Sequence, residues 1–401
     1  MNRIEKLLQK FCPDGVEFKA LGEVTIWDKK FKEVENQTKM IKFKHISAAA
    51  LKSLKCKNGT IKLLSTGNFD GFTTQDLSKD FINDDEVISL PSGGVANIKY
   101  HKGKFVDSGN LLAVSADTKT IDLKFIYYFL ISKREVIESF YRGAGVKHPS
   151  MREIFKLKIP IPPLEIQKEI VLILDAFTEL EAELEAELEA RRKQYEHYRE
   201  RLLSFDSFEK RAEGYGVKMM SLGEVCEKIL AGGDLPRKYI KEKEPTKEFI
   251  YPIYSNGTDL NSLYGYCDTY KIDKDCVTIS ARGTIGYHTP RKAKFTPIVR
   301  LITLIPNENL ANYKFLHYAL FITNIENTGT KSGIPQLTVP NVQKIKIPIP
   351  PLKVQNEVVE ILDKFDALVN DISQGLPAEI TARKKQYEHY REKLLSFKEK
   401  A

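Results

Sequence analysis

The side chains whose type and spacing could do chemistry in this sequence are lysines and arginines placed beside glycines. The basic segment Lys99–Lys104 follows Ser92-Gly-Gly94, and a similar segment, Tyr287–Lys294, follows Arg282-Gly-Thr284. Lysine and arginine neutralise phosphate groups, while glycine lets a backbone approach them closely. The pattern therefore predicts contact with nucleic acid, although solvated hairpin tips without such a role would look the same.

A second pair of basic, glycine-containing segments is Arg142–His148 and, more loosely, Gly329–Gly333. An arginine such as Arg142 or Arg282 is long enough to reach a guanine edge in the major groove. The candidate DNA-binding residues are Lys99, His101, Lys102, Lys104, Arg142, Lys147, Arg282, Arg291, Lys292, Lys294 and Lys331.

The motifs that would indicate an enzyme are incomplete. Gly329-Thr-Lys-Ser332 is similar to the end of a phosphate-binding loop, but that loop needs glycine directly before its lysine. The Pro-Pro pairs at 162–163 and 350–351 follow isoleucine, where a methyltransferase motif would need Asn or Asp. No histidine pair has zinc spacing and no Gly-x-Ser-x-Gly sequence occurs. We therefore expect no catalytic residue, no metal site and no cofactor in this chain.

Length and composition indicate a multidomain globular protein. At about 150 residues per domain, 401 residues predict two or three domains. The five cysteines form no Cys-x-x-Cys pair, which favours reduced thiols over disulfides or zinc. No apolar run approaches the ~20 residues of a membrane span. We expect a cytoplasmic protein that does not contact a membrane.

Long stretches of the sequence occur twice. Phe155–Leu164 returns as Gln343–Leu352, and Lys193–Glu200 returns as Lys385–Glu392. The period of about 190 residues is far longer than that of solenoid repeats. The sequence therefore predicts a duplicated unit of lobe plus helix, with lobes at 1–163 and 211–351 and helices at 164–210 and 352–401.

The lobes contain turn signals and short β-branched runs, which predict a mixed α+β structure. Val87–Leu90 is expected to be a strand and Lys124–Glu138 a helix. The net charge is +8 for residues 1–163 and +6 for residues 211–351, so the basic excess lies in the lobes. The helical segments carry −6 and 0.

Each helical segment carries an apolar seam with heptad spacing, from Ile166 to Phe205 and from Val354 to Phe397. The second has four additional residues and contains Gly375-Leu376-Pro377, which should break or kink it. The seams either pack on each other within the chain or bind partner helices. The candidate packing residues in the repeated part are Tyr195, His197, Tyr198, Leu202, Tyr387, His389, Tyr390 and Leu394.

Taken together, these repeats closely resemble the DNA-specificity subunit of type I restriction–modification systems. The resemblance is carried by Ile159–Glu169, Lys346–Leu352, the twin Lys-Gln-Tyr-Glu-His-Tyr-Arg-Glu segments and Leu376-Pro-Ala-Glu-Ile380. It covers essentially the whole chain. The first helix departs from the second by a simple Leu-Glu-Ala repeat over Leu180–Ala190.

The resemblance implies two target-recognition domains separated by an antiparallel pair of helices, each domain recognising one half of a bipartite DNA site. It implies two modification subunits and, for cleavage, restriction subunits as partners. S-adenosylmethionine, ATP and magnesium would belong to those partners. The alternatives are a DNA-modifying or DNA-cleaving enzyme, which lacks its motifs here, and a coiled-coil protein adaptor, which would not need two basic lobes.

Overall fold

The computed structural model describes residues 3–35, 37–212, 216–323, 325–328 and 336–400. These residues form two compact units. Unit 1 comprises Met1–Leu184 with Ile380–Ala401, and unit 2 comprises Glu185–Glu379. Each unit thus combines one lobe with parts of both long helical segments. Within the described ranges, no helix is both long and apolar enough to cross a bilayer.

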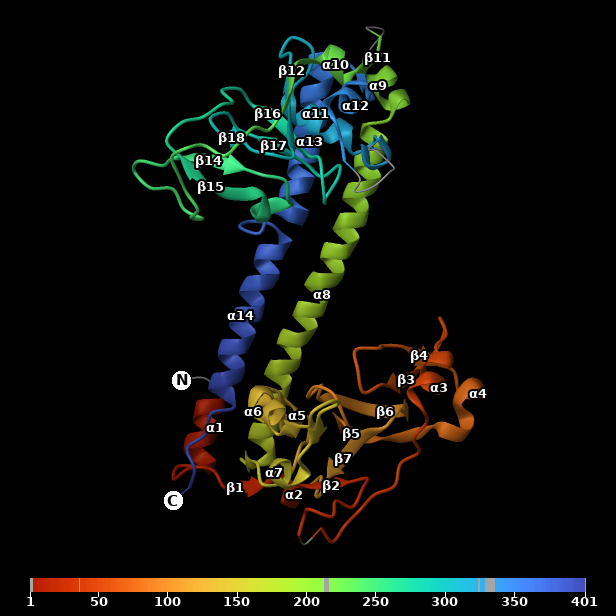
Figure 1. The fold of residues 1–401 in the computed structure, drawn as a ribbon. Helices are drawn as coiled ribbons and strands as arrows, with labels where there is room; N and C mark the ends of the chain where they lie inside the picture. The colour runs from red at the N-terminus through yellow and green to blue at the C-terminus, as the bar shows by residue number, and fades with distance from the viewer. Residues whose placement is uncertain (1–2, 36, 213–215, 324, 329–335, 401) are drawn as a thin grey trace. The chain divides into compact units, whose positions relative to one another are not determined.

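Unit 1 is built on a six-stranded sheet with the strand order β2-β7-β5-β6-β3-β4 (Figure 1). Strand β5 pairs antiparallel with β6 and β7, and β3 pairs parallel with β6. Residues 87–91 of β5 are all buried, as expected of a central strand, which confirms the predicted strand. The strands are β2 (Thr25–Trp27), β3 (Ile61–Leu64), β4 (Phe72–Thr73), β5 (Asn83–Pro91), β6 (Lys99–Asp107) and β7 (Asn110–Ser115).

Helix α5 (Leu123–Ser132) packs against β5 and β6. It begins after Asp122, whose carboxylate accepts hydrogen bonds from the backbone N–H groups of Lys124 and Phe125. The single helix predicted over Lys124–Glu138 is wrong, because Lys133 (φ −106°, ψ 18°) leaves helical geometry and a second helix follows. The other helices of this lobe are α1 (Arg3–Phe11), α2 (Leu21–Val24), α3 (Ala48–Ser53), α4 (Gln75–Ser78), α6 (Arg134–Ser139) and α7 (Met151–Phe155), with the 3₁₀ turn η1 (Lys79–Phe81).

Unit 2 repeats the central part of this sheet. Its strand order β12-β19-β16-β17 corresponds to β2-β7-β5-β6 of unit 1, and every pair is again antiparallel. A second sheet, β13-β15-β14-β18, is added beside it. The strands are β12 (Cys226–Ala231), β13 (Tyr239–Ile240), β14 (Tyr251–Tyr254), β15 (Leu263–Cys267), β16 (Cys276–Ser280), β17 (His288–Arg291), β18 (Thr296–Pro297) and β19 (Leu301–Pro306).

Short repeated elements bracket both lobes. The Leu-Gly-Glu-Val echo forms a one-turn helix each time, α2 and α10 (Leu222–Val225), and in each the glutamate accepts a hydrogen bond from the backbone N–H three residues earlier. Two-stranded ladders follow the same plan, β1 (Phe18–Ala20) with β10 (Lys158–Pro160) and β11 (Lys218–Ser221) with β20 (Lys346–Ile349). The remaining helices of unit 2 are α9 (Phe205–Arg211), α11 (Tyr313–Leu320), α12 (Val339–Gln343), η2 (Asp259–Ser262) and η3 (Ile325–Thr328).

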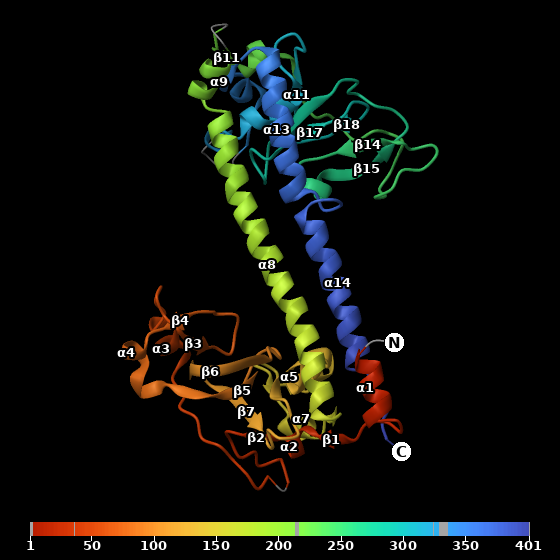
Figure 2. The ribbon, with the colours of Figure 1, turned by 180° about the vertical axis from the view of Figure 1, so that it is seen from behind.

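The long helices begin directly after the Pro-Pro pairs. The first is one helix of 39 residues, α8 (Leu164–Leu202). The second segment is two helices, α13 (Leu352–Asn370) and α14 (Leu376–Leu394), so the predicted break is confirmed. The chain turns so tightly at Gly375 that a Cβ there would lie 2.4 Å from the carbonyl oxygen of Ala367. Only glycine fits this position without a shift of the backbone. Figure 2 shows both long segments from behind.

Segments far apart in the sequence share a core within each unit. In unit 1 the first part of α8 runs antiparallel to α14, since Phe177 stacks on Tyr390 at 5.5 Å and Glu181 pairs with Lys384 at 3.2 Å. In unit 2 the last part of α8 supplies Tyr195 and Leu202 to the same apolar cluster as α11 and α13. Each lobe therefore shares its hydrophobic core with parts of the long helices.

One fully buried glutamine joins each lobe to its long helix. Gln167 of α8 accepts a hydrogen bond from the backbone N–H of Asp122 at 2.9 Å and donates to the carbonyls of Thr120 and Pro162 at 2.8 and 2.7 Å. Gln355 of α13 makes the same three bonds in unit 2, to the N–H of Asn312 and to the carbonyls of Leu310 and Pro350.

A second repeated polar contact lies two turns further along each helix. Asp175 of α8 accepts from Lys124 at 2.7 Å and from the hydroxyl of Tyr128 at 2.5 Å. In unit 2, Asp363 of α13 likewise accepts from Lys314 and, at 2.7 Å, from Tyr318. These contacts orient α5 and α11 on their helices.

We expect Gln167→Leu to lower the free energy of unfolding of unit 1 by about 2–4 kcal/mol, because it leaves an N–H group and two carbonyls buried without partners. Urea unfolding followed by circular dichroism measures the change. The matched control is Gln9→Leu on the exposed face of α1, which should alter stability by less than about 0.5 kcal/mol. Equal effects of the two variants would contradict a structural role for Gln167.

Candidate nucleic-acid interface

The two basic segments predicted after the glycine turns occupy equivalent strands. Tyr100 of β6 pairs with Ile88 of β5, and His288 of β17 pairs with Ile279 of β16. Since β5 and β16 are the corresponding central strands, the topology agrees with the sequence alignment of these segments. Their basic side chains nevertheless have different surroundings, and only some of them reach solvent.

In unit 1 two of the four candidates on β6 make internal contacts. The Lys99 ammonium donates to the carbonyl oxygens of Ser65 at 2.7 Å and Gly67 at 2.6 Å, and burial lowers its pKa. The His101 ring contacts the carbonyl of Lys104 at 3.1 Å, and burial lowers the pKa of His101. Lys99 and His101 thus bind backbone carbonyl groups of their own lobe.

The other two candidates on β6 are open to solvent. Lys102 lies 3.4 Å from Glu86 and is 70% exposed. Lys104 donates to the side-chain oxygen of Gln75 at 3.3 Å. The exposed ion pair of Lys102 and the long, exposed hydrogen bond of Lys104 each contribute little to stability, so both amines can exchange these partners for phosphate oxygens.

In unit 2, the Arg291 side chain is committed to the lobe itself. Its guanidinium stacks 3.8 Å from the ring centroid of Tyr254 and donates to Ser262 at 2.7 Å and Thr278 at 3.3 Å. Burial lowers the pKa of Arg291. The side chain therefore connects the two sheets of unit 2, a role that the basic pattern in the sequence did not distinguish from DNA binding.

The neighbouring basic residues of unit 2 are closer to solvent. Lys292 pairs with Asp275 at 2.7 Å, and this contact raises the pKa of Lys292. Lys294 is exposed and has a positive φ of 69°. The carbonyl of Arg282 accepts a hydrogen bond from the side-chain amide of Asn256 at 2.9 Å. The side chain of Arg282 is half-buried. Lys331, with the whole segment Gly329–Gly333, lies outside the described residues.

The structure brings together two segments of unit 1 that are far apart in the sequence. The turn at 92–97 lies against the loop at 142–148, with the N–H of Gly94 donating to the carbonyl of Lys147 at 2.8 Å. The ring of His148 contacts the carbonyl of Ser92 at 2.7 Å. We call these two segments the double loop. Its side chains Arg142 and Lys147 are exposed.

The repeated tyrosines of the long helices pack inside the chain. Tyr195 and Tyr198 stack on Phe365 with ring centroids 6.3 and 5.4 Å apart. In unit 1, Tyr390 stacks on Phe177 at 5.5 Å and stays 39% exposed, and Tyr387 lies against Phe177 at 6.2 Å with its ring tilted by 50°. Packing within the chain, one of the two alternatives, thus accounts for these four side chains.

The other packing candidates divide between core and surface. Leu202 is buried and Leu394 is half-buried, whereas His197 and His389 are exposed and contact only the tyrosine that follows each of them among the ring contacts of the described residues. The predicted seams are wrong at Phe205, Leu368 and Ile372, which are 39%, 38% and 75% exposed. These positions lie at or beyond helix ends, because α8 ends at Leu202 and α13 ends at Asn370, and the heptad register does not continue past those ends.

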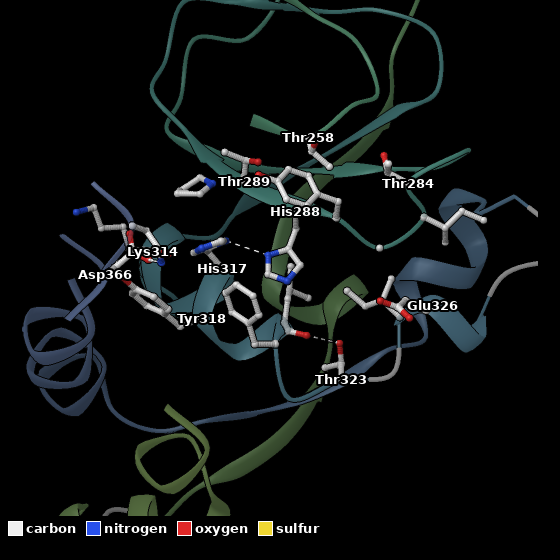
Figure 3. A pocket seen from close by; sticks show the side chains of 18 of the residues that line it. Thr258, Thr284, His288, Thr289, Lys314, His317, Tyr318, Thr323, Glu326 and Asp366 are labelled. Carbon is white, nitrogen blue, oxygen red and sulfur yellow. Dashed lines mark hydrogen bonds between the residues drawn. The ribbon is translucent and has the colours of Figure 1, made fainter. Parts of the chain in front are cut away.

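An open cavity of about 1310 Å³ in unit 2 was not predicted (Figure 3). On its wall the Nδ1 atoms of His288 and His317 lie 2.9 Å apart, so one ring donates and the other accepts. The ring of Phe321 packs against both imidazoles. Burial lowers the pKa of His288 to about 4 and holds that of His317 well below its ordinary value, so both rings are neutral at pH 7.

A family model described as the type I restriction modification DNA specificity domain matches this chain twice, over residues 15–190 and 215–382. The chain belongs to this family. The two matches fall on the two repeats, so the DNA-specificity subunit resemblance of the sequence is confirmed and each unit holds one copy of the domain.

Curated members of the family are similar over most of their length. A putative type I specificity subunit of Mycoplasma pneumoniae is 35% identical over 313 residues, which are 75% of this chain and 90% of the relative. A putative type I restriction enzyme specificity subunit of Haemophilus influenzae is 31% identical and is covered over 98% of both chains. The EcoR124I/EcoR124II specificity subunit of Escherichia coli is 33% identical over 70% of this chain and 72% of its own.

Solved structures support the specificity-subunit fold. The S subunit of a type I restriction–modification system from M. genitalium superposes with a TM-score of 0.67 and 20% identity, covering 95% of this chain and 96% of its own. A chain from a study of complex assembly and conformational transition of the type I R-M system gives a TM-score of 0.54, with 19% identity and coverages of 96% and 98%. At such identities the likeness concerns the fold alone.

We expect the histidine pair to make unit 2 of this family member sensitive to mild acid. The unfolded chain binds a proton on His288 near pH 6.5, whereas the folded chain does so only near pH 4, so stability falls as the pH drops from 6.5 toward 4. Urea unfolding at a series of pH values measures the slope. Unit 1 holds Tyr100 and Tyr127, with rings 5.8 Å apart, at the corresponding places.

The matched variant therefore carries His288→Tyr and His317→Tyr, which should flatten this slope. His317→Gln, which removes one titrating ring with less change in volume, should flatten it in part. His197→Gln, at an exposed position, should leave the slope as it is. If the double variant were as acid-sensitive as the parent chain, groups other than these histidines would cause the loss of stability.

Proposed function

We propose that this chain is the DNA-specificity subunit of a type I restriction–modification complex, and that each lobe recognises one half of a bipartite duplex site. The observation that carries the proposal is the double family match, one DNA-specificity domain in each repeat. The exposed basic side chains Arg142, Lys147, Lys102 and Lys104 support DNA contact by unit 1, and Lys294 supports it for unit 2.

The proposed functional division follows the repeat. Residues 1–163 and 211–351 form the target-recognition lobes, and residues 164–210 and 352–401 form the spacer helices. Net charges of +8 and +6 on the lobes suit a polyanionic ligand, and they predict an affinity for duplex DNA that falls steeply with salt. The chain itself performs no chemistry in this scheme.

The partners follow from the family. Two modification subunits would dock on the repeated helices, one for each repeat, and restriction subunits would join for cleavage. S-adenosylmethionine, ATP and magnesium would be bound by those subunits. The exposed His197 and His389 are at corresponding places on the two helical repeats, which suits two copies of one partner.

The helices would also set the spacing between the two half-sites. The helix α8 is continuous over 39 residues, about 58 Å at 1.5 Å per residue. Glu185, in the middle of its Leu-Glu-Ala stretch, lies between the contacts of Phe177 and Glu181 in unit 1 and those of Leu188, Tyr195 and Leu202 in unit 2. An insertion after Glu185 would therefore lengthen α8 without replacing any of these contact residues.

We expect that exchanging residues 211–351 for the lobe of a relative changes one half of the methylated site and leaves the other half as it was. The measurement is the methylation pattern of DNA from cells that express the hybrid with its modification subunits. The control is the purified chain alone, which should leave DNA unmethylated in the presence of S-adenosylmethionine and magnesium. If both halves changed, or neither did, the lobes would not act independently.

Adding four residues after Glu185 should lengthen α8 by about 6 Å, close to two base-pair steps of 3.4 Å, while turning its distal part by only about 40°. This variant should stay folded and methylate a site with a longer spacer. Adding two residues turns the distal part by about 200°, which moves Tyr195, Tyr198 and Leu202 away from their partners and should abolish folding or methylation. An active four-residue variant with an unchanged spacer would refute the spacing role.

A further inference from the structure

Two valines stand exposed at the tip of the double loop in unit 1. Val95 is 59% exposed and Val146 is 66% exposed, although both belong to a lobe whose other branched aliphatic side chains largely pack into cores. An exposed apolar group rimmed by polar residues marks a binding surface more often than a single scattered valine does. Here the two valines come from different segments and face solvent on adjoining loops.

The fold holds these valines outward. Hydrogen bonds join the two segments from Gly94 to Lys147 and from His148 to Ser92, and the N–H of Ala96 donates to Glu138 at 2.5 Å. A Cβ on Gly93 would lie 2.9 Å from Cγ1 of Val146, so glycine permits this close approach. The valines could not turn inward without breaking these contacts, and their exposure is therefore built into the loop.

The positive charge around the two valines favours a negatively charged partner. The double loop carries Arg142 and Lys147, both exposed, and contains no aspartate or glutamate. The nearby Glu138 is occupied by the N–H of Ala96. An apolar tip with a basic rim fits a polyanion from which apolar groups project. Duplex DNA has this combination in its major groove, where phosphates flank the C5-methyl group of thymine.

Unit 2 differs at the corresponding turn. There Ile285 follows Arg282-Gly-Thr284, but its side chain is half-buried and packs on the core of unit 2. Within the described part of unit 2, this turn thus has no exposed aliphatic side chain like Val95 or Val146, and we confine the inference to unit 1.

We infer that Val146, assisted by Val95, contacts a thymine methyl group in the half-site recognised by unit 1, with Arg142 and Lys147 on the flanking phosphates or guanine edge. This inference rests on the proposed function. It assigns to that half-site at least one T·A pair whose recognition depends on the methyl group and not on hydrogen bonds alone.

The test uses the complex assembled with its modification subunits. The methylated site is determined first, and the half that changes on exchange of residues 1–163 is assigned to unit 1. Synthetic duplexes then carry deoxyuridine in place of each thymine of that half in turn, which removes only the methyl group. Fluorescence anisotropy at one fixed salt concentration gives each Kd.

At one thymine or more, deoxyuridine should weaken binding about fourfold, which corresponds to the ~0.8 kcal/mol of one buried methyl group. In the Val146→Ala complex the same substitution should have less than about a twofold effect, since the contact is already lost. Val136→Ala, at an exposed valine of α6 outside the double loop, should keep the full sensitivity. Deoxyuridine in the other half-site should act alike in all three complexes.

A half-site without thymine, or one that tolerates deoxyuridine everywhere, would overturn the inference while leaving the bipartite methylation, and so the proposed function, in place. An equal loss for every duplex with Val146→Ala would overturn it as well, as would a loss of assembly with the modification subunits, which would make the tip a protein contact. Absence of any site-specific methylation would instead refute the proposed function.

Discussion

The hydrogen bonds of one buried glutamine in each unit fix where the long helix starts relative to the strands before it. Gln167 and Gln355 each satisfy two carbonyls and one N–H group of chain that has left regular structure, at the entry of α5 or α11 and at the Pro-Pro pair. Because unpaired polar groups are costly in a core, these bonds leave one arrangement of lobe and helix. Because a helix is rigid over a few turns, the bonds of Gln167 and Gln355 also determine where Asp175 and Asp363 lie.

The stacks of Phe177 and Phe365 on repeated tyrosines complete this arrangement. Each phenylalanine belongs to the beginning of one helical repeat, and its tyrosines belong to the end of the other. A change in one repeat is therefore felt in the partner segment of the opposite repeat. This reciprocity gives a physical reason why the helical parts of the two copies have stayed alike while the lobes, whose cores are separate clusters, have diverged.

The repeat allowed much of the fold to be predicted, because equal sequences make equal elements. The helix starts at Leu164 and Leu352 and the equivalence of β6 with β17 follow from it, whereas the break near Gly375 follows from a Gly-Leu-Pro sequence that only the second copy contains. The candidate site was harder to predict, since a lysine pattern does not tell which side chains turn inward. Lys99 and Arg291 proved to be held by carbonyls, hydroxyls and a ring that lie 13 to 37 residues away in the chain, contacts that only the folded structure brings together.

Unit 1 closes on itself through the residues that follow α14. Val16 exchanges backbone hydrogen bonds with this segment, accepting one from Lys400 at 2.9 Å and donating one to Lys398 at 2.8 Å, while Leu395 enters the core that holds α1. Unit 2, by contrast, is a single uninterrupted stretch of chain. During synthesis the lobe made second can therefore complete its core first, and the lobe made first must wait for residues 380–400. The core of unit 1 is therefore the last to have all of its residues, although its lobe is the first to be made.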